Sequence, residues 1–516
     1  MTVSDSTIEG PFAGALKLFL VIFITLMGAV GIGVVASIKP LWAIAAVFGI
    51  LFLLVLFKWP DAATLLVVFY IYANLGPVLM NFHGVPSFIA MGAPVLLSIP
   101  LVWYLLVRRE KLIITPVFQW LLMLLGVYIL GAVFSSDIIL ASRKLIDYCF
   151  EGVLLYFFLT NVIRTPAMLK RVVWVLLISG ALIGGLALYQ QMTHTFNNNY
   201  GGLAQTDSGF GTGVQNLQGQ VTQPRLAGTI GEKNRFAQNM LMLVPLGLFQ
   251  LWIYRSTWAR ILALLLTGLI IVGGALSFSR GAAVGFILLI LIMVLLRYIK
   301  FYQLAFLALG AYLVLWMFPQ YGARLATLSV FTDVASTNST AALSGADGAI
   351  RGRATDILAA LLIFRDHPVV GVGTGMVPLY IQAYSRGVGF RYLTRDMQAH
   401  SLFPGFAAES GILGLICLIL ILSIPMRDLA RSRKGWLESH PDWSYMATAF
   451  FQVLMSYIIT GLFLHMSYMR FFYMMVALAV MASSFKEAET PIETEATETA
   501  SAPGVSGLAI LQGKGT

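Results

Sequence analysis

Long apolar stretches separated by short polar connections make up most of this chain. A helix needs roughly 20 apolar residues to cross a hydrocarbon core about 30 Å thick. This length predicts about fourteen spans, at 16–37, 41–57, 62–80, 87–107, 115–134, 145–163, 171–192, 236–254, 259–276, 282–299, 302–318, 402–425, 444–464 and 467–485. The pattern therefore predicts an all-α polytopic membrane protein with about 12–14 transmembrane helices.

Composition agrees with this class. Of the 516 residues, 59% are hydrophobic and 11% are charged, whereas soluble domains carry about 25% charged residues. A soluble enzyme is therefore excluded. The two cysteines, Cys149 and Cys417, both lie in apolar runs, so a disulfide or zinc framework is not expected.

The net charge of +10 has to be interpreted through membrane topology, and it does not indicate nucleic acid as a partner. Lys and Arg concentrate in alternate short connections, at Lys58, Arg108, Arg109, Lys111, Arg164, Lys170, Arg171, Arg255, Arg260, Arg297, Lys300, Arg427, Arg431, Arg433 and Lys434. The positive-inside rule places these connections in the cytoplasm. We therefore expect both termini to be cytoplasmic, with an N-terminal segment 1–15, a membrane domain 16–485 and a disordered acidic tail 486–516.

Two connections are much longer than the others, at 193–235 and 319–400. By parity of the spans, both face outward. Long loops in compact proteins are usually functional or disordered. The second contains a predicted helix at about 351–365, whose apolar stripe is formed by Ile357, Leu358, Leu361 and Leu362. We expect this helix to lie at the membrane interface or to pack on the bundle.

The basic residues of the second loop are all arginines, namely Arg324, Arg351, Arg353, Arg365, Arg386, Arg391 and Arg395. The planar guanidinium fork binds phosphate through two hydrogen bonds, which Lys cannot do. An anionic ligand that carries phosphate is therefore one interpretation. Ion pairing with the loop's aspartates, Asp333, Asp347, Asp356, Asp366 and Asp396, is the other.

Three residues near the outer ends of spans are candidates for chemistry. Arg280 follows Ser277-Phe278-Ser279 at a tight outward turn, where an arginine is costly unless it is paired, functional or extended to the interface. His400 lies where the second loop re-enters the membrane, and His exchanges protons near neutral pH. Glu409 lies inside a span. On a continuous helix, nine residues would place it on the opposite face from His400, so orienting the loop is its alternative role.

No phosphate-binding loop, HExxH motif or Cys/His ligand set occurs, and Gly371-Val372-Gly373-Thr374-Gly375 lacks the strand–helix context of a dinucleotide site. We therefore expect chemistry without a metal and without a cofactor.

Three segments together resemble the O-antigen ligase/polymerase family of bacterial envelope glycosyltransferases. They are Arg225-Leu226-Ala227-Gly228-Thr229 with Asn234, then Ser277 to Gly281, then Asp366 to Gly373 with Ala399-His400-Ser401 and Glu409 to Gly414. The resemblance covers roughly 220–425, in the order in which the family has these segments. Ser401 departs from the family, which often has Asn there.

The resemblance implies an inner-membrane enzyme whose site faces the periplasm, so that both long loops would be periplasmic. It would move a glycan from undecaprenyl diphosphate to a hydroxyl of a glycan or lipid-linked acceptor, with inversion. Arg225 and Arg280 would bind the diphosphate, and we expect Arg353 and Arg391 to assist them. His400 would be the base, and Glu409 is a second catalytic candidate.

We favour a polysaccharide polymerase over an O-antigen ligase that acts on lipid A-core and over a protein O-glycosyltransferase, because the long loops could hold a growing chain. A protein that regulates chain length is a further candidate partner. The alternative from another class is a transporter, in particular a lipid-linked oligosaccharide flippase. A flippase should carry charges deep in several spans, whereas these charges lie at the outer ends and in the loops.

Overall fold

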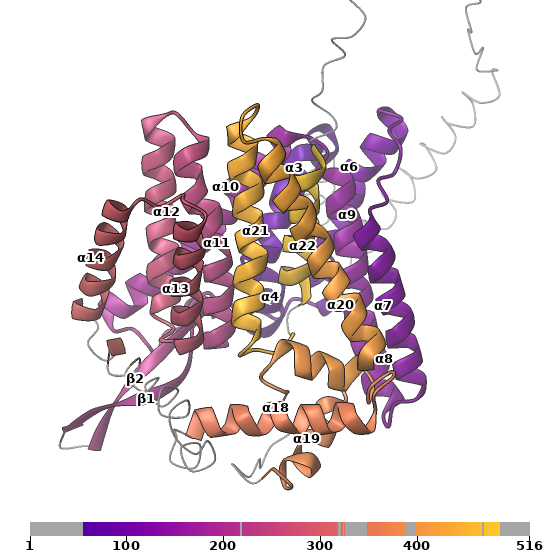
Figure 1. The fold of residues 1–516 in the computed structure, drawn as a ribbon, viewed down its shortest axis with the longest axis vertical. Helices are drawn as coiled ribbons and strands as arrows, with labels where there is room; N and C mark the ends of the chain where they lie inside the picture. The colour runs from indigo at the N-terminus through magenta and orange to yellow at the C-terminus, as the bar shows by residue number, and fades with distance from the viewer. Residues whose placement is uncertain are drawn as a thin grey trace, which may run out of the picture.

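The computed structural model describes residues 55–216, 219–317, 321–322, 325, 348–388, 398–466 and 469–485. Figure 1 shows an upright helical bundle that carries a β-hairpin and two further helices at one end. The first half of the bundle contains α3 (Pro60–Tyr72), α4 (Leu75–His83), α5 (Ser87–Ala90), η1 (Ala93–Leu97), α6 (Ser98–Val102), η2 (Trp103–Val107), α7 (Pro116–Val133), α8 (Ile138–Tyr148), η3 (Cys149–Leu154), α9 (Leu155–Val162) and α10 (Pro166–Thr193). The second half contains α11 (Lys233–Ile253), α12 (Thr257–Ala275), α13 (Arg280–Leu295), α14 (Phe301–Met317), α20 (Leu402–Gly435), α21 (Pro441–Gly461) and α22 (Met469–Ser484).

The predicted fold class is confirmed. The first two of the fourteen predicted spans fall almost entirely on residues 1–54, outside the described part, as do the segment 1–15 and the tail 486–516. Each of the other twelve coincides with a helix or a run of contiguous helices. Within the described residues, seven helices are long and apolar enough to cross a membrane, and α3 and α4, bent by 61° to each other, pass the same test only when taken together.

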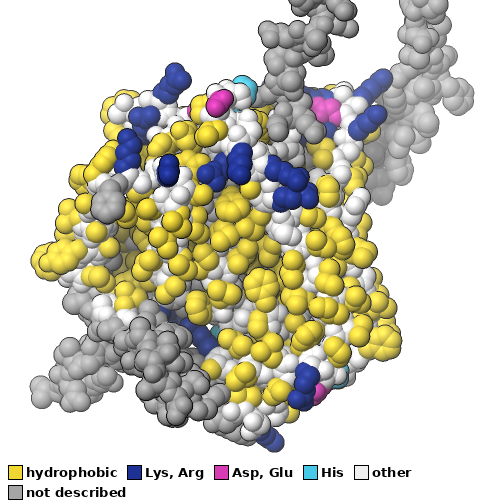
Figure 2. Space-filling model, viewed as in Figure 1, with side chains coloured by type: hydrophobic (Ala, Val, Ile, Leu, Met, Phe, Trp, Pro, Cys, Tyr) yellow, Lys and Arg dark blue, Asp and Glu magenta, His cyan; other side chains and the backbone are white. Residues whose placement is uncertain are grey.

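The two ends of the bundle differ in charge. One end, here called the basic end, carries the connections at 108–115, 163–165, 254–256, 296–300 and 436–440. Figure 2 shows Lys and Arg side chains gathered along this upper end, above a broad hydrophobic belt. The opposite end, here called the loop end, carries both long connections (Figure 1).

Both long connections contain regular structure. The first forms η4 (Tyr200–Gly202) and an antiparallel hairpin of β1 (Gln205–Asn216) and β2 (Gly219–Gly228). The hydropathy pattern did not predict this hairpin, because its strands are polar and rich in glycine. The second contains α18 (Gly348–Asp366), which confirms the predicted helix, and α19 (Val377–Ser385).

The buried face of α18 differs from its apolar stripe. Leu358 and Leu361 are 40% and 44% exposed, whereas Asp356, Ala359 and Ile363 are buried against the bundle. The side of α18 that faces the bundle therefore carries mostly small and polar residues, together with Ile363. This arrangement brings a carboxylate into the protein interior.

The longest helix, α20, is broken at Gly411, whose φ of 62° and ψ of −164° are not helical. The break frees the carbonyls of Ala408 and Glu409, and segment 368–375 occupies them. Val372 N donates to Ala408 O (3.0 Å) and Gly373 N to Glu409 O (3.0 Å), while Ile412 N donates to Pro368 O (2.8 Å). The chain thus satisfies backbone groups that could not stay unpaired within a span.

Candidate active site

The turn between α12 and α13 has an uncommon backbone. Phe278 adopts a left-handed conformation with a φ of 51°, which costs a non-glycine residue about 1–2 kcal/mol. Its side chain is 1% exposed and meets the rings of Phe210 and Tyr321 edge-on, at 5.3 and 5.5 Å. The buried aromatic ring holds the turn so that Arg280 begins α13.

Arg225, on β2, holds the same turn from the other side. Its Nε donates to Ser277 O (2.7 Å), and its Nη2 lies within hydrogen-bond distance of Phe278 O (3.3 Å) and of Asn234 Oδ1 (3.2 Å). The residue is 5% exposed. The guanidinium fork therefore ties together the hairpin, the turn and the first residues of α11.

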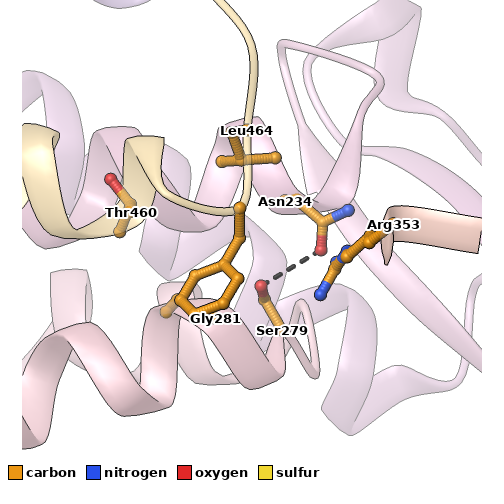
Figure 3. Close-up of a pocket in the computed structure, with 8 residues that line it drawn as sticks. Asn234, Ser279, Gly281, Arg353, Thr460 and Leu464 are labelled. Atoms are coloured by element: carbon orange, nitrogen blue, oxygen red, sulfur yellow. Dashed lines mark hydrogen bonds between the residues drawn. The ribbon is translucent and has the colours of Figure 1, made fainter. Parts of the chain in front are cut away.

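A small pocket opens beside this turn (Figure 3). It is lined by Asn234, Ser279, Gly281, Ala282, Arg353, Thr460, Phe463 and Leu464. Arg353 reaches in from α18, with its guanidinium carbon 6.0 Å from the centre of the Phe463 ring. The pocket is thus formed where α11, α13, α18 and α21 meet.

The N-terminus of α13 contributes backbone amides to this pocket. Ser279 Oγ donates to Asn234 Oδ1 (3.1 Å, dashed in Figure 3) and does not cap the helix with its side chain. By contrast, Glu232 caps α11 by accepting from the amides of Asn234 and Arg235. The amides at Gly281 and Ala282 therefore lack a side-chain cap, and the positive end of a helix dipole faces the pocket.

His400 is held by a buried carboxylate. Its Nδ1 lies 2.7 Å from Asp356 Oδ2, and the Asp356 side chain is 2% exposed while that of His400 is 27% exposed. Asp356 lies one helical turn from Arg353 on α18, so the same helix reaches the pocket and the imidazole. Such a partner fixes which ring nitrogen carries the proton.

A second histidine stands beside the first. The His465 ring centre is 6.1 Å from that of His400, with the ring planes at 82°. Burial, together with the nearby charge of Arg235, lowers the pKa of His465 well below its usual value. His465 is therefore neutral at physiological pH, and the connection 462–466 contributes it together with the pocket residues Phe463 and Leu464.

Glu409 contacts a different part of the protein. Its Oε1 accepts from the amide of Gly375 (3.1 Å), next to the segment that closes the break in α20. The helix runs without interruption from Leu402 to the break at Gly411, so no kink at Pro404 turns Glu409 toward His400. This geometry favours the loop-orienting role over the catalytic one.

The structure thus brings together four of the predicted site residues, Arg225, Arg280, Arg353 and His400, from elements far apart in sequence. Arg391 lies outside the described residues. Sequence reasoning treated Asp356 only as a possible ion-pair partner of arginine, and it did not select His465. The spacing of Arg353 and Asp356, three residues apart on a predicted helix, was the signal that both side chains reach one place.

Within the described ranges, no group of three or more His, Cys, Asp or Glu residues is arranged to hold a metal ion.

These features define a polytopic membrane protein with a polar site at one end of its bundle, formed by arginines, a carboxylate-held histidine and an uncapped helix end. Residues 265–419 match the family model described as O-antigen ligase. The predicted resemblance is confirmed over that stretch. The match indicates a membrane glycosyltransferase of the O-antigen ligase and polymerase type.

The matched stretch contains the Arg280 turn, α18, His400 and Glu409, and it begins after the Arg225 segment. A search of curated proteins found no match to this chain.

Proposed function

We propose that this protein transfers a glycan from undecaprenyl diphosphate to a sugar hydroxyl, with His400 as the base. The observation that carries the proposal is the 2.7 Å contact between His400 Nδ1 and the buried carboxylate of Asp356, next to a pocket bounded by Arg353. A carboxylate on Nδ1 leaves Nε2 of the neutral imidazole free to accept a proton.

The transfer needs one bond to form and one to break. The acceptor oxygen attacks the anomeric carbon from the face opposite the diphosphate and gives its proton to His400. The bond from the anomeric carbon to the diphosphate oxygen breaks, and the lipid diphosphate leaves with the electron pair. This route inverts the anomeric configuration and requires no metal in the site.

The departing diphosphate gains negative charge, which the pocket is suited to stabilise. Arg353 lines the pocket and supplies a guanidinium group, and the amides of α13, which begins at Arg280, supply further donors. We propose that Arg280 also binds the diphosphate. We assign Arg225 a positioning role, since its guanidinium hydrogen-bonds the turn that carries Arg280.

The identity of the acceptor molecule is a separate question from the chemistry of the transfer. We retain the polysaccharide polymerase as the first candidate, with the O-antigen ligase and the protein O-glycosyltransferase as alternatives, because both loop-end connections are long and could hold a growing chain. We further propose that the loop end faces the periplasm and that both termini are cytoplasmic, because lysines gather at the basic end.

Purified protein in lipid nanodiscs, mixed with lipid-diphosphate glycan and EDTA, tests the proposal. We expect release of lipid diphosphate together with a longer glycan, and an inverted anomeric signal in the NMR spectrum of the product. His400→Ala and Arg280→Ala should each lower the rate at least about 100-fold. A matched control is Arg365→Ala, which removes an exposed arginine at the end of α18.

Movement of intact lipid-linked glycan across the bilayer without release of lipid diphosphate would overturn the proposal in favour of a flippase. Loss of transfer in EDTA, with recovery on addition of a divalent cation, would overturn the metal-independent mechanism alone.

A further inference from the structure

A buried ion pair lies inside the helical bundle. Arg470, in the first turn of α22, pairs through Nη1 with Glu151 Oε1, and the two side chains are 11% and 19% exposed. Glu151 belongs to η3, near the middle of the candidate span Ile138–Val162. At such a depth the loss of hydration offsets much of the attraction between the charges. The stability of the bundle therefore does not by itself account for this pair.

Arg470 also bonds the break between α3 and α4, here called the bend. Its Nη2 donates to Asn74 Oδ1 (2.6 Å). Asn74 is 1% exposed and has a left-handed backbone with a φ of 56°, a conformation that Asn adopts more readily than most residues. One guanidinium group thus joins α22, η3 and the bend.

The side-chain amide of Asn74 extends this connection toward the site. Its Nδ2 donates to Thr229 O (2.7 Å). An amide accepts only through its oxygen and donates only through its nitrogen, so the guanidinium on Oδ1 directs the NH2 group at Thr229. Removal of the guanidinium would free the amide to turn over, and Oδ1 would then repel the Thr229 carbonyl.

Thr229 belongs to a segment that builds the site. It lies between Arg225, whose guanidinium holds the turn before α13, and Asn234, which lines the pocket. The bend holds this region at a second place, because Tyr72 Oη donates to Asn239 O on α11 (2.6 Å). The position of the bend therefore sets the position of two groups of the site.

We propose that Arg470 is a positioning residue for the transfer site, on which it acts through Asn74 and the segment that begins at Arg225. The proposal rests on the proposed function and adds to it a set of contacts inside the bundle that fixes the geometry of the site. Glu151 orients the guanidinium and balances its charge. The contrasting role is purely structural, in which the pair only joins α22 to η3.

Three variants separate positioning from stability. Arg470→Met with Glu151→Met replaces both charges by flexible apolar side chains, whose burial costs no hydration of charge. Asn74→Gly keeps the ion pair and a backbone that glycine adopts freely, but removes the amide. The matched control is Arg164→Met with Glu110→Met, which removes an ion pair (2.9 Å) at the basic end.

We expect the double-Met variant at 470 and 151, and Asn74→Gly, to lower kcat about 10- to 100-fold with donor KM within about threefold. A displaced turn before α13 affects the transition state more than the bound donor. The Tm of both should stay close to that of the parent protein, and the control should keep the parental kcat. Steady-state transfer assays and thermal unfolding measure these quantities.

Hydrogen–deuterium exchange in nanodiscs supplies a second readout. We expect the amides of 226–236 to exchange about tenfold faster in both variants, with the rest of the bundle unchanged. This measurement needs no turnover, so it tests the positioning role even if the transferase assay fails. The two proposals can therefore fail separately.

Parental kcat and parental exchange in the double-Met variant would overturn the proposal. So would faster exchange across α22, α9 and the bend alike, which would mean that the pair only joins these helices. Loss of activity in the double-Met variant but not in Asn74→Gly would contradict the path through the amide. If the double-Met variant does not fold, Asn74→Gly decides by the same two readouts.

Discussion

At the scale of single residues, the arginines of the site fall into two kinds. Arg225 is 5% exposed and hydrogen-bonds the carbonyls of Ser277 and Phe278. Arg353 lines an open pocket. A buried guanidinium that bonds protein carbonyls fixes geometry, whereas one at a pocket wall is placed to bind an anion.

The pairing of Asp356 with His400 yields the sharpest single-residue prediction. Asp356→Asn keeps the size of the side chain but removes the charge that favours Nδ1–H, so the imidazole can present the wrong tautomer to the acceptor. We expect a fall in kcat of about 10²–10⁴ with little change in donor KM. Steady-state transfer assays measure both constants.

The control for this variant lies on the same helix. Asp366→Asn removes an exposed carboxylate that pairs with Arg365 and should leave kcat within about twofold, because surface pairs contribute little. Similar losses in both variants would mean that the charge of α18 matters in general and not the contact with His400.

Lysine substitutions separate the two kinds of arginine. Arg225→Lys keeps the positive charge but cannot reach three acceptors, and we expect a loss of about 10- to 100-fold as the Arg280 turn shifts. Arg353→Lys should retain more activity, since a charge remains at the pocket wall. Initial rates at saturating donor compare the two, and greater tolerance of Lys at position 225 than at 353 would contradict the positioning role.

Much of this site could be predicted from residue types and order. Arg280 and His400 stood out because each lies at the outer end of a span, where a polar residue is costly. The partnership of Asp356 with His400 could not be predicted, because it joins residues 44 positions apart through the packing of α18 on the bundle. His465 was missed because it follows an apolar run with no neighbouring motif.

At the scale of elements, the break in α20 is a feature that the hydropathy pattern does not predict. A continuous apolar run predicts a continuous helix, yet Gly411 interrupts it and segment 368–375 completes the hydrogen bonding. The same close approach of two backbones explains the glycines of segment 368–375. A Cβ at Gly371 would lie 2.4 Å from the Glu409 carbonyl carbon, so the glycine-rich sequence reflects close backbone approach and not phosphate binding.

Gly411→Ala should therefore be strongly destabilising. A Cβ at this position would lie 2.1 Å from Val369 O, and the backbone conformation itself costs a non-glycine residue about 1–3 kcal/mol. We expect a fall of several degrees in Tm, measured by thermal unfolding in detergent.

Gly268→Ala in α12 is the matched control, because a Cβ there would have no atom within 4 Å. It should leave Tm unchanged or slightly raised, given the higher helix propensity of Ala. An unchanged Tm for Gly411→Ala would mean that the break can close into a regular helix.

At the scale of the whole molecule, the helical architecture was the most predictable property, because span length and charge asymmetry are imposed by the bilayer itself. The hairpin was the least predictable, since polar, glycine-rich strands produce no hydropathy signal. The hairpin is formed by the pairing of its two strands and by its contacts with α11. Both are tertiary contacts between separate segments, which the hydropathy of a single segment does not report.

The orientation of the bundle can be measured on intact cells. In a Cys149→Ala, Cys417→Ala background, Ser136→Cys lies at the loop end and Ser256→Cys at the basic end, both on exposed residues. We expect a membrane-impermeant maleimide to label position 136 and not 256. Labelling of position 256 alone would reverse the proposed topology.

The backbone hydrogen bonds between segment 368–375 and α20 also limit which segments can be exchanged between related proteins. The backbone groups of residues 408–413 obtain their partners from the preceding loop, so this span is complete only in the presence of its own loop. Exchange of the loop between relatives without the first three turns of α20 would separate two halves of one hydrogen-bonded unit. Evolution and engineering alike should therefore move the second loop and the start of α20 together, as one inherited block.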